Sequence, residues 1–448
     1  MKQLLMCLVG VCLTGSNLAQ EIMKEPPAWS YSANIYEVNI RQYTPEGTFA
    51  AFSEHLPRLQ EMGVDILWLM PVQPIGTERR KGNLGSYYSI RDYTAVNPAF
   101  GTAEDFRALV IQAHRLGMKV ILDWVANHSA WDHAWVADNP TFYTTNKSGY
   151  IVPPVADWSD VADLNYDNDQ LRREMTAAMR YWIENFDIDG FRCDVAGMVP
   201  DDYWRTTIRE LTAVKADLFM LAEAEGPQFH RNGFDMTYGS KLHHEMNKVA
   251  AGERSAIDLE AAVMDGLETF PEAAYRMQFI TNHDENSWNG IEFDRMGEAA
   301  LTFFVVAATV PGMPLLYSGQ EAGLDKSLRF FDKDTISFEG LPKYAPFYTR
   351  MLQLKKTNKS LWNGDWGGSL FTLYLDEQVW VYAREREGHK VLVAVNLSEE
   401  PSSIKLDSEA LKGRYTNVFT SEKLNLSGKL KTNLAPWEYL VLSQDDSR

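Results

Sequence analysis

The segment Gly190-Phe191-Arg192-Cys193-Asp194 begins as an apolar, strand-like run and ends in a carboxylate close to an arginine. Three other segments follow the same pattern: Asp123-Trp-Val-Ala-Asn-His128, Leu221-Ala-Glu-Ala-Glu225 and Thr281-Asn-His-Asp-Glu-Asn286. Each of these runs is too apolar for a surface loop, yet each finishes in acids, His or Arg. If the four runs are parallel neighbours in one sheet, their ends converge on one pocket.

Apolar strand candidates alternate with amphipathic helices along most of the chain. We predict eight strands, at 34–40, 66–71, 120–123, 191–194, 219–223, about 234–238, 278–282 and 315–317. A predicted helix over 102–116 carries an apolar stripe behind a Thr102 cap, and Gly117 ends it. This alternation predicts an α/β fold, a parallel (β/α)8 TIM barrel, with its active site at the carboxyl ends of the strands.

The length of 448 residues and the hydrophobic content of 45% suit one large domain plus a smaller one. We expect the barrel to occupy residues 20–361, with a loop subdomain at 129–165 that follows the third strand and shapes the pocket mouth. From 362 to 448 the pattern changes to short alternating runs bounded by Gly, Asn and Ser. This change predicts a C-terminal antiparallel β-sandwich domain.

The amino terminus resembles a targeting segment. Met1 and Lys2 precede an apolar stretch and then small and polar residues, which predicts a signal peptide over residues 1–19 and export to the periplasm or the medium. Cys7 and Cys12 lie within it, but neither follows the small residue that is typical of a lipoprotein signal, so lipid anchoring is disfavoured. Removal of the signal leaves Cys193 as the one cysteine, so no intrachain disulfide can form.

Charge and hydropathy exclude other partners. The formal net charge is -18 and no Lys/Arg stripe is present, so we expect no nucleic-acid partner. The segment 299–317 is apolar enough to suggest a membrane span, but Pro311, Gly312 and Pro314 interrupt it. A buried helix followed by a buried strand explains it better, and we expect no membrane span in the mature chain.

Arg192 and Asp194 point to the same face of their strand because side chains alternate with a period of two. A guanidinium beside a carboxylate should lower the pKa of that acid and keep it ionised, as a nucleophile requires. Asp194 is therefore the candidate nucleophile, although an isolated Arg-x-Asp pair is more often a structural ion pair. Cys193 points to the opposite face, where we expect a buried, inert thiol.

Two further acids can complete the site. A carboxyl at the end of the fifth strand, partly surrounded by apolar residues, can have a raised pKa and donate a proton, but Glu223 and Glu225 share the same parity and spacing does not choose between them. Asp284 follows His283, a pair suited to binding sugar hydroxyls and stabilising positive charge. Several acids with one Arg between them suit the cleavage of a glycosidic bond.

Five further motifs accompany these segments in order: IYEVNIRQY at 35–43, GSYYSIRDY at 85–93, NPAFGT at 97–102, VADLN at 161–165 and PLLYSGQEAG at 314–323. Together they make the chain resemble the α-amylase family of glycoside hydrolases (family 13) over nearly its whole mature length. The resemblance implies that Asp194 is the nucleophile, that Glu223 rather than Glu225 is the acid/base, and that Asp284 stabilises the transition state. It also implies a set of sugar-binding residues: Tyr88, Asp92, His128, Arg192 and His283.

The implied activity is hydrolysis of α-glucosidic bonds in maltooligosaccharides or related α-glucans, with retention of configuration. The alternatives are a transglycosylase with the same chemistry and a relative that binds glucan without cleaving it. Gly197 and Met198 stand where many amylases of the family carry Lys-His, so long starch is not fixed as the substrate.

The resemblance also raises one cofactor, a calcium ion near Asn127 and Asp163. These two residues supply only two of the six to eight oxygens that calcium needs. No organic cofactor is expected, and His243-His244-Glu245 lacks the i, i+4 histidine pair of a zinc helix.

Overall fold

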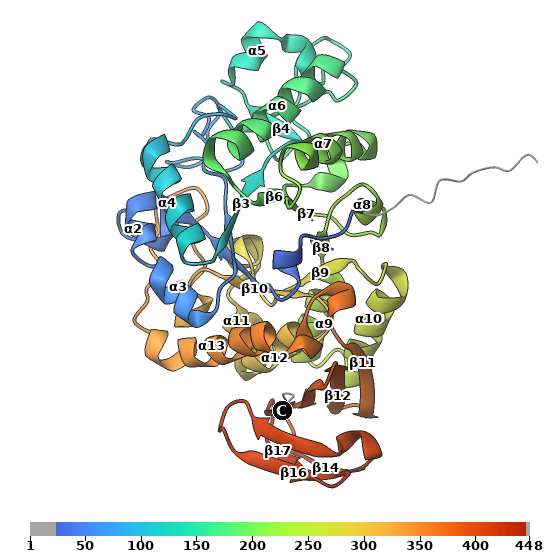
Figure 1. Cartoon of the computed structure of the whole chain (residues 1–448). Helices are drawn as coiled ribbons and strands as arrows, with labels where there is room; N and C mark the ends of the chain where they lie inside the picture. Colours follow the sequence, from blue (N-terminus) through green and yellow to red (C-terminus); the bar gives the residue numbers. More distant parts are fainter. Residues whose placement is uncertain (1–23, 445–448) are drawn as a thin grey trace, which may run out of the picture.

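The computed structural model describes residues 24–444 (Figure 1), so the predicted signal peptide lies outside the described residues. Eight parallel strands close into a barrel in the order β1-β10-β9-β8-β7-β6-β3-β2. Their bounds are β1 Ile35–Val38, β2 Ile66–Leu69, β3 Lys119–Trp124, β6 Gly190–Cys193, β7 Phe219–Ala222, β8 Met236–Tyr238, β9 Tyr275–Gln278 and β10 Met313–Tyr317. The predicted (β/α)8 TIM barrel is confirmed.

Helices surround the barrel. The longer ones are α3 Leu56–Met62, α4 Ala103–Arg115, α6 Asp169–Phe186, α7 Asp201–Val214, α9 Ser240–Ala250, α10 Ala256–Thr269, α12 Ala300–Thr309 and α13 Leu341–Thr357. Short helices lie in the connections: α1 Ile40–Tyr43, α2 Phe49–Ser53, α5 Ala134–Asp138, α8 Gln228–Arg231 and α11 Glu292–Met296. Thr102 caps α4 as predicted, because its hydroxyl accepts from the backbone N–H of Asp105.

Apolar side chains fill the barrel interior below a polar layer. Ile121 and Met277 belong to this inner cluster, which also includes Trp68, Phe219 and Leu315. Cys193 instead belongs to the outer core under the helices, so the predicted buried thiol is confirmed, and burial raises its pKa well above the ordinary value. Gly190 is required in β6 because a Cβ there would overlap the carbonyl oxygen of Phe219 on β7.

The seventh strand was placed wrongly. We expected it over 278–282, but β9 spans Tyr275–Gln278. The apolar pair Phe279 and Ile280 is buried just beyond the strand, so burial alone made it resemble strand residues. The segment 299–317 forms α12 and β10 as predicted, and no helix of the described residues is long and apolar enough to cross a membrane.

The interval after β3 makes an excursion that ends in α6. It contains a two-stranded antiparallel sheet, β4 His128–Ala130 with β5 Val161–Asp163, and the helix α5. Figure 1 shows this part at the end of the molecule opposite the C-terminal domain. His128 pairs with Asp163 in the sheet register, so the excursion begins and ends beside the barrel mouth.

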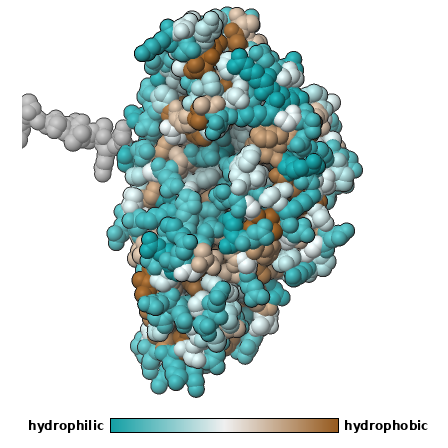
Figure 2. Space-filling model, turned by 180° about the vertical axis from the view of Figure 1, so that it is seen from behind, coloured by the Kyte–Doolittle hydropathy of each residue, from teal (hydrophilic) through white to brown (hydrophobic). Residues whose placement is uncertain are grey.

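The C-terminal strands form two facing sheets. The first has the order β11-β12-β13-β18-β15-β16, and the second pairs β14 with β17. Their bounds are β11 Ser369–Leu375, β12 Val379–Arg386, β13 His389–Asn396, β14 Ser402–Asp407, β15 Gly413–Asn417, β16 Lys423–Leu426, β17 Lys429–Leu434 and β18 Tyr439–Gln444. Ile404 and Leu430 pack with Val381 and Leu392 in one core, which confirms the antiparallel β-sandwich. The face shown in Figure 2 is mostly hydrophilic, with apolar side chains in small groups.

Candidate active site

One buried guanidinium joins the acids at the carboxyl ends of three adjacent strands. Arg192 Nη1 lies 2.8 Å from Asp123 Oδ1 and 2.9 Å from Asp194 Oδ1. Its Nη2 lies 2.8 Å from Glu223 Oε2. The register explains this convergence, because Asp123 on β3 pairs with Arg192 on β6, and Arg192 pairs with Leu221, two residues before Glu223. Two of the three predicted acids, Asp194 and Glu223, therefore meet at Arg192.

Asp194 is almost fully enclosed, with 7% of its surface exposed. Its backbone N–H donates to the carbonyl of Trp124, which fixes the chain as it leaves β6. The expectation of a lowered pKa was wrong. Burial raises the pKa of Asp194 well above the ordinary value, and the charge of Glu223 raises it further, against the opposing effect of Arg192.

Glu223 is half-buried and is held by the backbone of the turn that follows β6. Its Oε2 accepts a 2.6 Å hydrogen bond from the N–H of Val195. Val195 has φ 35 and ψ 47, a left-handed conformation that costs a β-branched residue about 1–3 kcal/mol. This strained turn directs its N–H at the carboxylate. Glu225, the alternative acid, is exposed and has no ion pair with Arg192 among the described residues.

His283 holds the third acid. Its Nδ1 lies 2.5 Å from Glu37 Oε1 on β1, and its Nε2 lies 3.4 Å from Asp284 Oδ2. Burial lowers the pKa of His283, but the charges of Asp284 and Glu37 outweigh burial and raise it to about 9. The imidazolium therefore orients Asp284, which is only half-buried and open to a substrate.

Tyr88 connects this pair to the acid cluster. Its hydroxyl lies 2.7 Å from His283 Nε2 and donates to Asp123 Oδ2 at 3.1 Å. The ring of Tyr88 lies parallel to that of Phe330, with centroids 6.3 Å apart, and Phe330 contacts the exposed Trp288 at 5.2 Å. A row of aromatic rings thus leads outward from the acids, and such faces suit the C–H surfaces of sugars.

The remaining predicted sugar-binding residues lie in two different settings. His128 is buried, and burial lowers its pKa to about 4, so it is neutral near pH 7. The amide of Asn127 donates to His128 Nδ1 at 3.2 Å, which leaves the ring proton on Nε2. Asp92 is exposed and accepts from the N–H and hydroxyl of Thr94, so the structure does not bring it to the acid cluster.

Asn127 and Asp163, the two residues predicted near a calcium ion, form no calcium site by themselves. Asp163 is half-buried, its pKa is raised by burial, and the Thr144 side chain bonds to it. Within residues 24–444 no group of three or more His, Cys, Asp or Glu side chains is placed to hold a metal ion. Asn127 and Asp163 do not amount to the oxygen cage of calcium, so calcium stays a prediction.

Sequence reasoning assigned no role to four residues that hold the site: Glu37, Trp68, Asp123 and Tyr238. The indole of Trp68 donates to Asp123 Oδ2 at 3.1 Å, and Tyr238 Oη accepts from Arg192 Nε at 3.2 Å. Glu37 and Asp123 are fully buried. For Glu37 and Asp123, the sequence signal that could have indicated a role was a lone acid inside an otherwise apolar strand, because such a buried charge requires a partner.

Fold and site together define a class: a (β/α)8 barrel whose strand ends place three carboxylates around one guanidinium and a further acid, Asp284, beside one imidazolium. The family model "Alpha amylase, catalytic domain" matches residues 30–154 and 155–356, and "Maltogenic Amylase, C-terminal domain" matches 371–441. The chain belongs to the α-amylase family.

Similar proteins agree with this assignment. The chain is 28% identical over 419 residues to the alpha-amylase MalA of Haloarcula japonica, which covers 88% of this chain and 59% of that protein. It is 26% identical to alpha-amylase 3 of Dictyoglomus thermophilum, over 67% of this chain and 66% of that protein. The chain thus spans less than two thirds of the length of these two relatives.

Two crystal structures match nearly end to end. An alpha-amylase from Lactobacillus plantarum superposes with a TM-score of 0.83 at 28% identity, covering 93% of this chain and 100% of that one. A maltogenic alpha-amylase from Thermotoga neapolitana superposes with a TM-score of 0.84 at 30% identity, covering 92% and 98%.

Proposed function

We propose that this protein is a retaining glycoside hydrolase that cleaves α-glucosidic bonds in maltooligosaccharides or related α-glucans. An oxygen of Asp194 forms a bond to the anomeric carbon while the bond to the leaving oxygen breaks and Glu223 gives that oxygen its proton. Water then attacks the anomeric carbon, Glu223 takes the proton of the water, and Asp194 leaves as a carboxylate. Asp284 stabilises the positive charge that develops on the ring.

The observation that carries this proposal is the shared guanidinium of Arg192, which holds Asp194 and Glu223 at 2.9 and 2.8 Å. A double displacement needs two carboxyls about 5–5.5 Å apart, and one planar cation between them supports a spacing of that order. The family membership and the names of the similar proteins favour α-glucans as the substrate class.

The test is hydrolysis of maltotriose by the wild type and by two variants. Asp194→Asn and Glu223→Gln should each lower kcat by a factor of about 10² or more, because each removes a group that reacts in the transition state. Glu225→Gln is the matched control and should retain activity. Near wild-type turnover in either of the first two variants would overturn the roles.

A transglycosylase is the second candidate. One similar protein, over 206 residues at 32% identity, is an α-1,4-glucan:maltose-1-phosphate maltosyltransferase of Mycobacterium tuberculosis. Transfer differs from hydrolysis only in whether a sugar or water takes the glycosyl group from Asp194. Chromatography of the products from maltotriose separates the two, since products longer than the substrate require transfer. A non-catalytic glucan-binding role is disfavoured because Asp194, Glu223 and Asp284 are all present.

We also propose that the protein is exported. The charged start, apolar run and small residues of 1–19 support cleavage after Ala19 and a mature protein outside the cytoplasm. Mass spectrometry of the protein from culture fractions tests this, because a mature chain that begins at Gln20 requires processing, whereas an intact Met1 in the cytoplasm contradicts it.

A further inference from the structure

The outer face of β9 carries two polar side chains where a barrel strand normally presents apolar ones to its helices. Tyr275 and Met277 point into the barrel core, so Arg276 and Gln278 point outward. They line a cavity of about 680 Å³ between α9, α10 and β9 on one side and the start of the C-terminal domain on the other.

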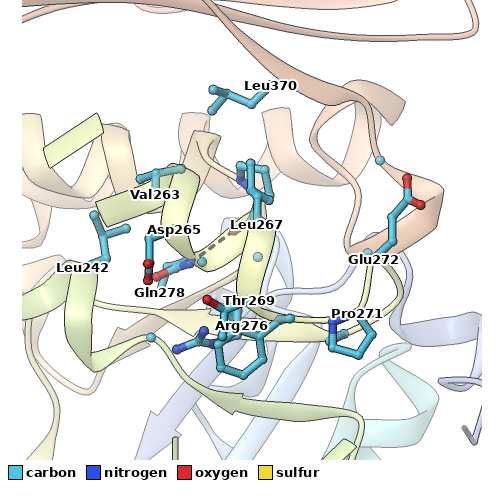
Figure 3. Close-up of a pocket in the computed structure, with 18 of the residues that line it drawn as sticks. Leu242, Val263, Asp265, Leu267, Thr269, Pro271, Glu272, Arg276, Gln278 and Leu370 are labelled. Atoms are coloured by element: carbon cyan, nitrogen blue, oxygen red, sulfur yellow. Dashed lines mark hydrogen bonds between the residues drawn. The ribbon is translucent and has the colours of Figure 1, made fainter. Parts of the chain in front are cut away.

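Figure 3 shows how the lining side chains lie. Asp265, Thr269, Arg276 and Gln278 gather on one side of the cavity, and Leu370 of the C-terminal domain faces them from across it. Apolar walls are supplied by Leu242, Val263, Leu267 and Phe270. The lining includes none of the three acids of the active site, so this is a separate cavity.

One buried polar atom in this cavity lacks a hydrogen-bond partner within the described residues. Gln278 is 7% exposed, its Nε2 donates to Pro311 O at 3.1 Å, and its Oε1 has no hydrogen-bond partner within the described residues. The guanidinium of Arg276 lies 3.6 Å above the Phe270 ring and donates to Tyr238 O through Nε at 3.2 Å and through Nη2 at 2.5 Å. An unpaired buried amide oxygen of this kind points to a ligand that donates a hydrogen bond, as a hydroxyl does.

The charges in the cavity favour a neutral ligand. The acids that line it are Glu225, Asp265, Glu272 and Asp365. The bases that line it are Lys241, Arg276, Arg384 and Arg386. These charges cancel, which gives an anion or a cation no net attraction, whereas planar Arg, Gln and Asp groups beside apolar walls suit the hydroxyls and C–H faces of a sugar.

We propose that this cavity, which we call the β9 groove, is a second, non-catalytic subsite that binds two or three units of a neutral oligosaccharide. The volume lies in the range of small-molecule sites. The inference rests on the proposed function only for the choice of an α-glucan as the ligand. A chain held there would be tethered to the enzyme while another part of it reacts, so the groove should matter for long glucans and not for short ones.

Gly266 offers a direct way to fill the groove. It lies within α10 and lines the cavity, and a Cβ built on it meets nothing within 4 Å. Gly266→Trp would therefore occupy the space, while Gly266→Ala is the matched control that should leave it open and strengthen the helix. Gln278→Met removes the unpaired oxygen without filling the groove and serves as a second, independent variant.

Calorimetric titration with maltohexaose tests the proposal in the full-length chain with the Asp194→Asn change, which prevents cleavage of the ligand. We expect two sites per chain with Gly266 or Gly266→Ala, and one site with Gly266→Trp. Gln278→Met should weaken the second site by roughly tenfold, the effect of one buried hydrogen bond. One site in every variant, or sulfate displacing maltohexaose from the second site, would overturn the inference.

Kinetics with active enzyme separate this inference from the proposed function. Gly266→Trp should retain kcat/KM for maltotriose and raise KM for amylopectin severalfold, whereas Gly266→Ala should change neither. Equal kinetics of the two Gly266 variants on amylopectin contradict the groove alone. Absence of maltotriose hydrolysis by the wild type contradicts the proposed function, and the two-site titration would still decide the groove.

Discussion

Arg192 lies at the centre of the site because three residues from different strands need the same cation. The sequence alone could place Asp194 beside Arg192, because the two residues are two positions apart at the end of one predicted strand. The pKa direction of Asp194 could not be predicted in this way, because Glu223 and Asp123 reach the same guanidinium from β7 and β3. Local spacing showed the one group that lowers the pKa of Asp194, and did not show the burial and the three carboxylates, Glu223, Asp123 and Asp284, that raise it.

The coupling of the two carboxyls predicts a pH effect. Glu223→Gln removes the charge that is the second cause of the raised pKa of Asp194, so Asp194 should ionise at lower pH. With an α-glycosyl fluoride, whose leaving group needs no proton, the acidic limb of the glycosylation rate should move to lower pH in this variant. Glu225→Gln should leave the limb in place, and an unmoved or raised limb in Glu223→Gln would contradict the coupling.

The aromatic row predicts an effect that grows with substrate length. Trp288 is 57% exposed and meets Tyr88 through Phe330, so it can stack on a sugar unit outside the bond that is cleaved. Trp288→Ala should lower kcat/KM for maltoheptaose by roughly tenfold, the effect of about 1.4 kcal/mol of binding energy. Activity on a short aryl glucoside should change little, and Trp288→Phe should retain most of the wild-type value. Equal losses on both substrates would contradict a stacking role.

At the scale of elements, the ion pair of His283 and Glu37 fastens the loop after β9 to β1. The pKa of His283 is about 9 in the folded chain and about 6.5 in an unfolded one. A raised folded pKa gives stability that is complete below pH 6.5 and is lost as pH rises through 9. His283→Gln should therefore lower the free energy of unfolding most at pH 6 and progressively less towards pH 10.

Urea unfolding of both proteins at several pH values measures this difference. His244→Gln is the matched control, since His244 is exposed on α9. A difference between His283→Gln and the wild type that stays constant from pH 6 to pH 10 would contradict the assigned charge state.

Most elements could be predicted from periodicity because apolar strands and capped helices leave clear patterns. The bounds of strand β9 were predicted wrongly for a physical reason. Its outward residues Arg276 and Gln278 are polar, line the β9 groove and interrupt the apolar pattern of the strand. The apolar Phe279 and Ile280 then displaced the predicted strand by a few residues. The roles of Glu37 and Tyr238 in the site could not be predicted for a related reason, because a single polar residue in a strand does not reveal which partner it contacts.

At the scale of the whole molecule, a fully buried arginine joins the two domains. Arg384 on β12 donates to the carbonyls of Val310 and Thr309 at the end of α12, and to Gly368 and Trp362 in the linker. Burial lowers its pKa to about 9. Arg384 therefore links the sandwich to the barrel through backbone acceptors and not through an acid.

Arg384→Met should leave several buried carbonyls unpaired and lower the free energy of unfolding by about 3 kcal/mol. Calorimetry should then resolve separate transitions for the barrel and the sandwich. Arg386→Met, at an exposed position on the same strand, should behave like the wild type. A single unshifted transition in Arg384→Met would show that the domains are held together by other contacts.

The most direct measurement is covalent trapping of the sugar on the enzyme. A 5-fluoro-α-glucosyl fluoride forms the glycosyl-enzyme faster than water releases it, so the labelled chain can be digested and its peptides weighed. The account predicts one sugar attached to Asp194, and none on Asp194→Asn. A label on Glu223 or Asp284, or an unlabelled enzyme that still turns over maltotriose, would contradict it.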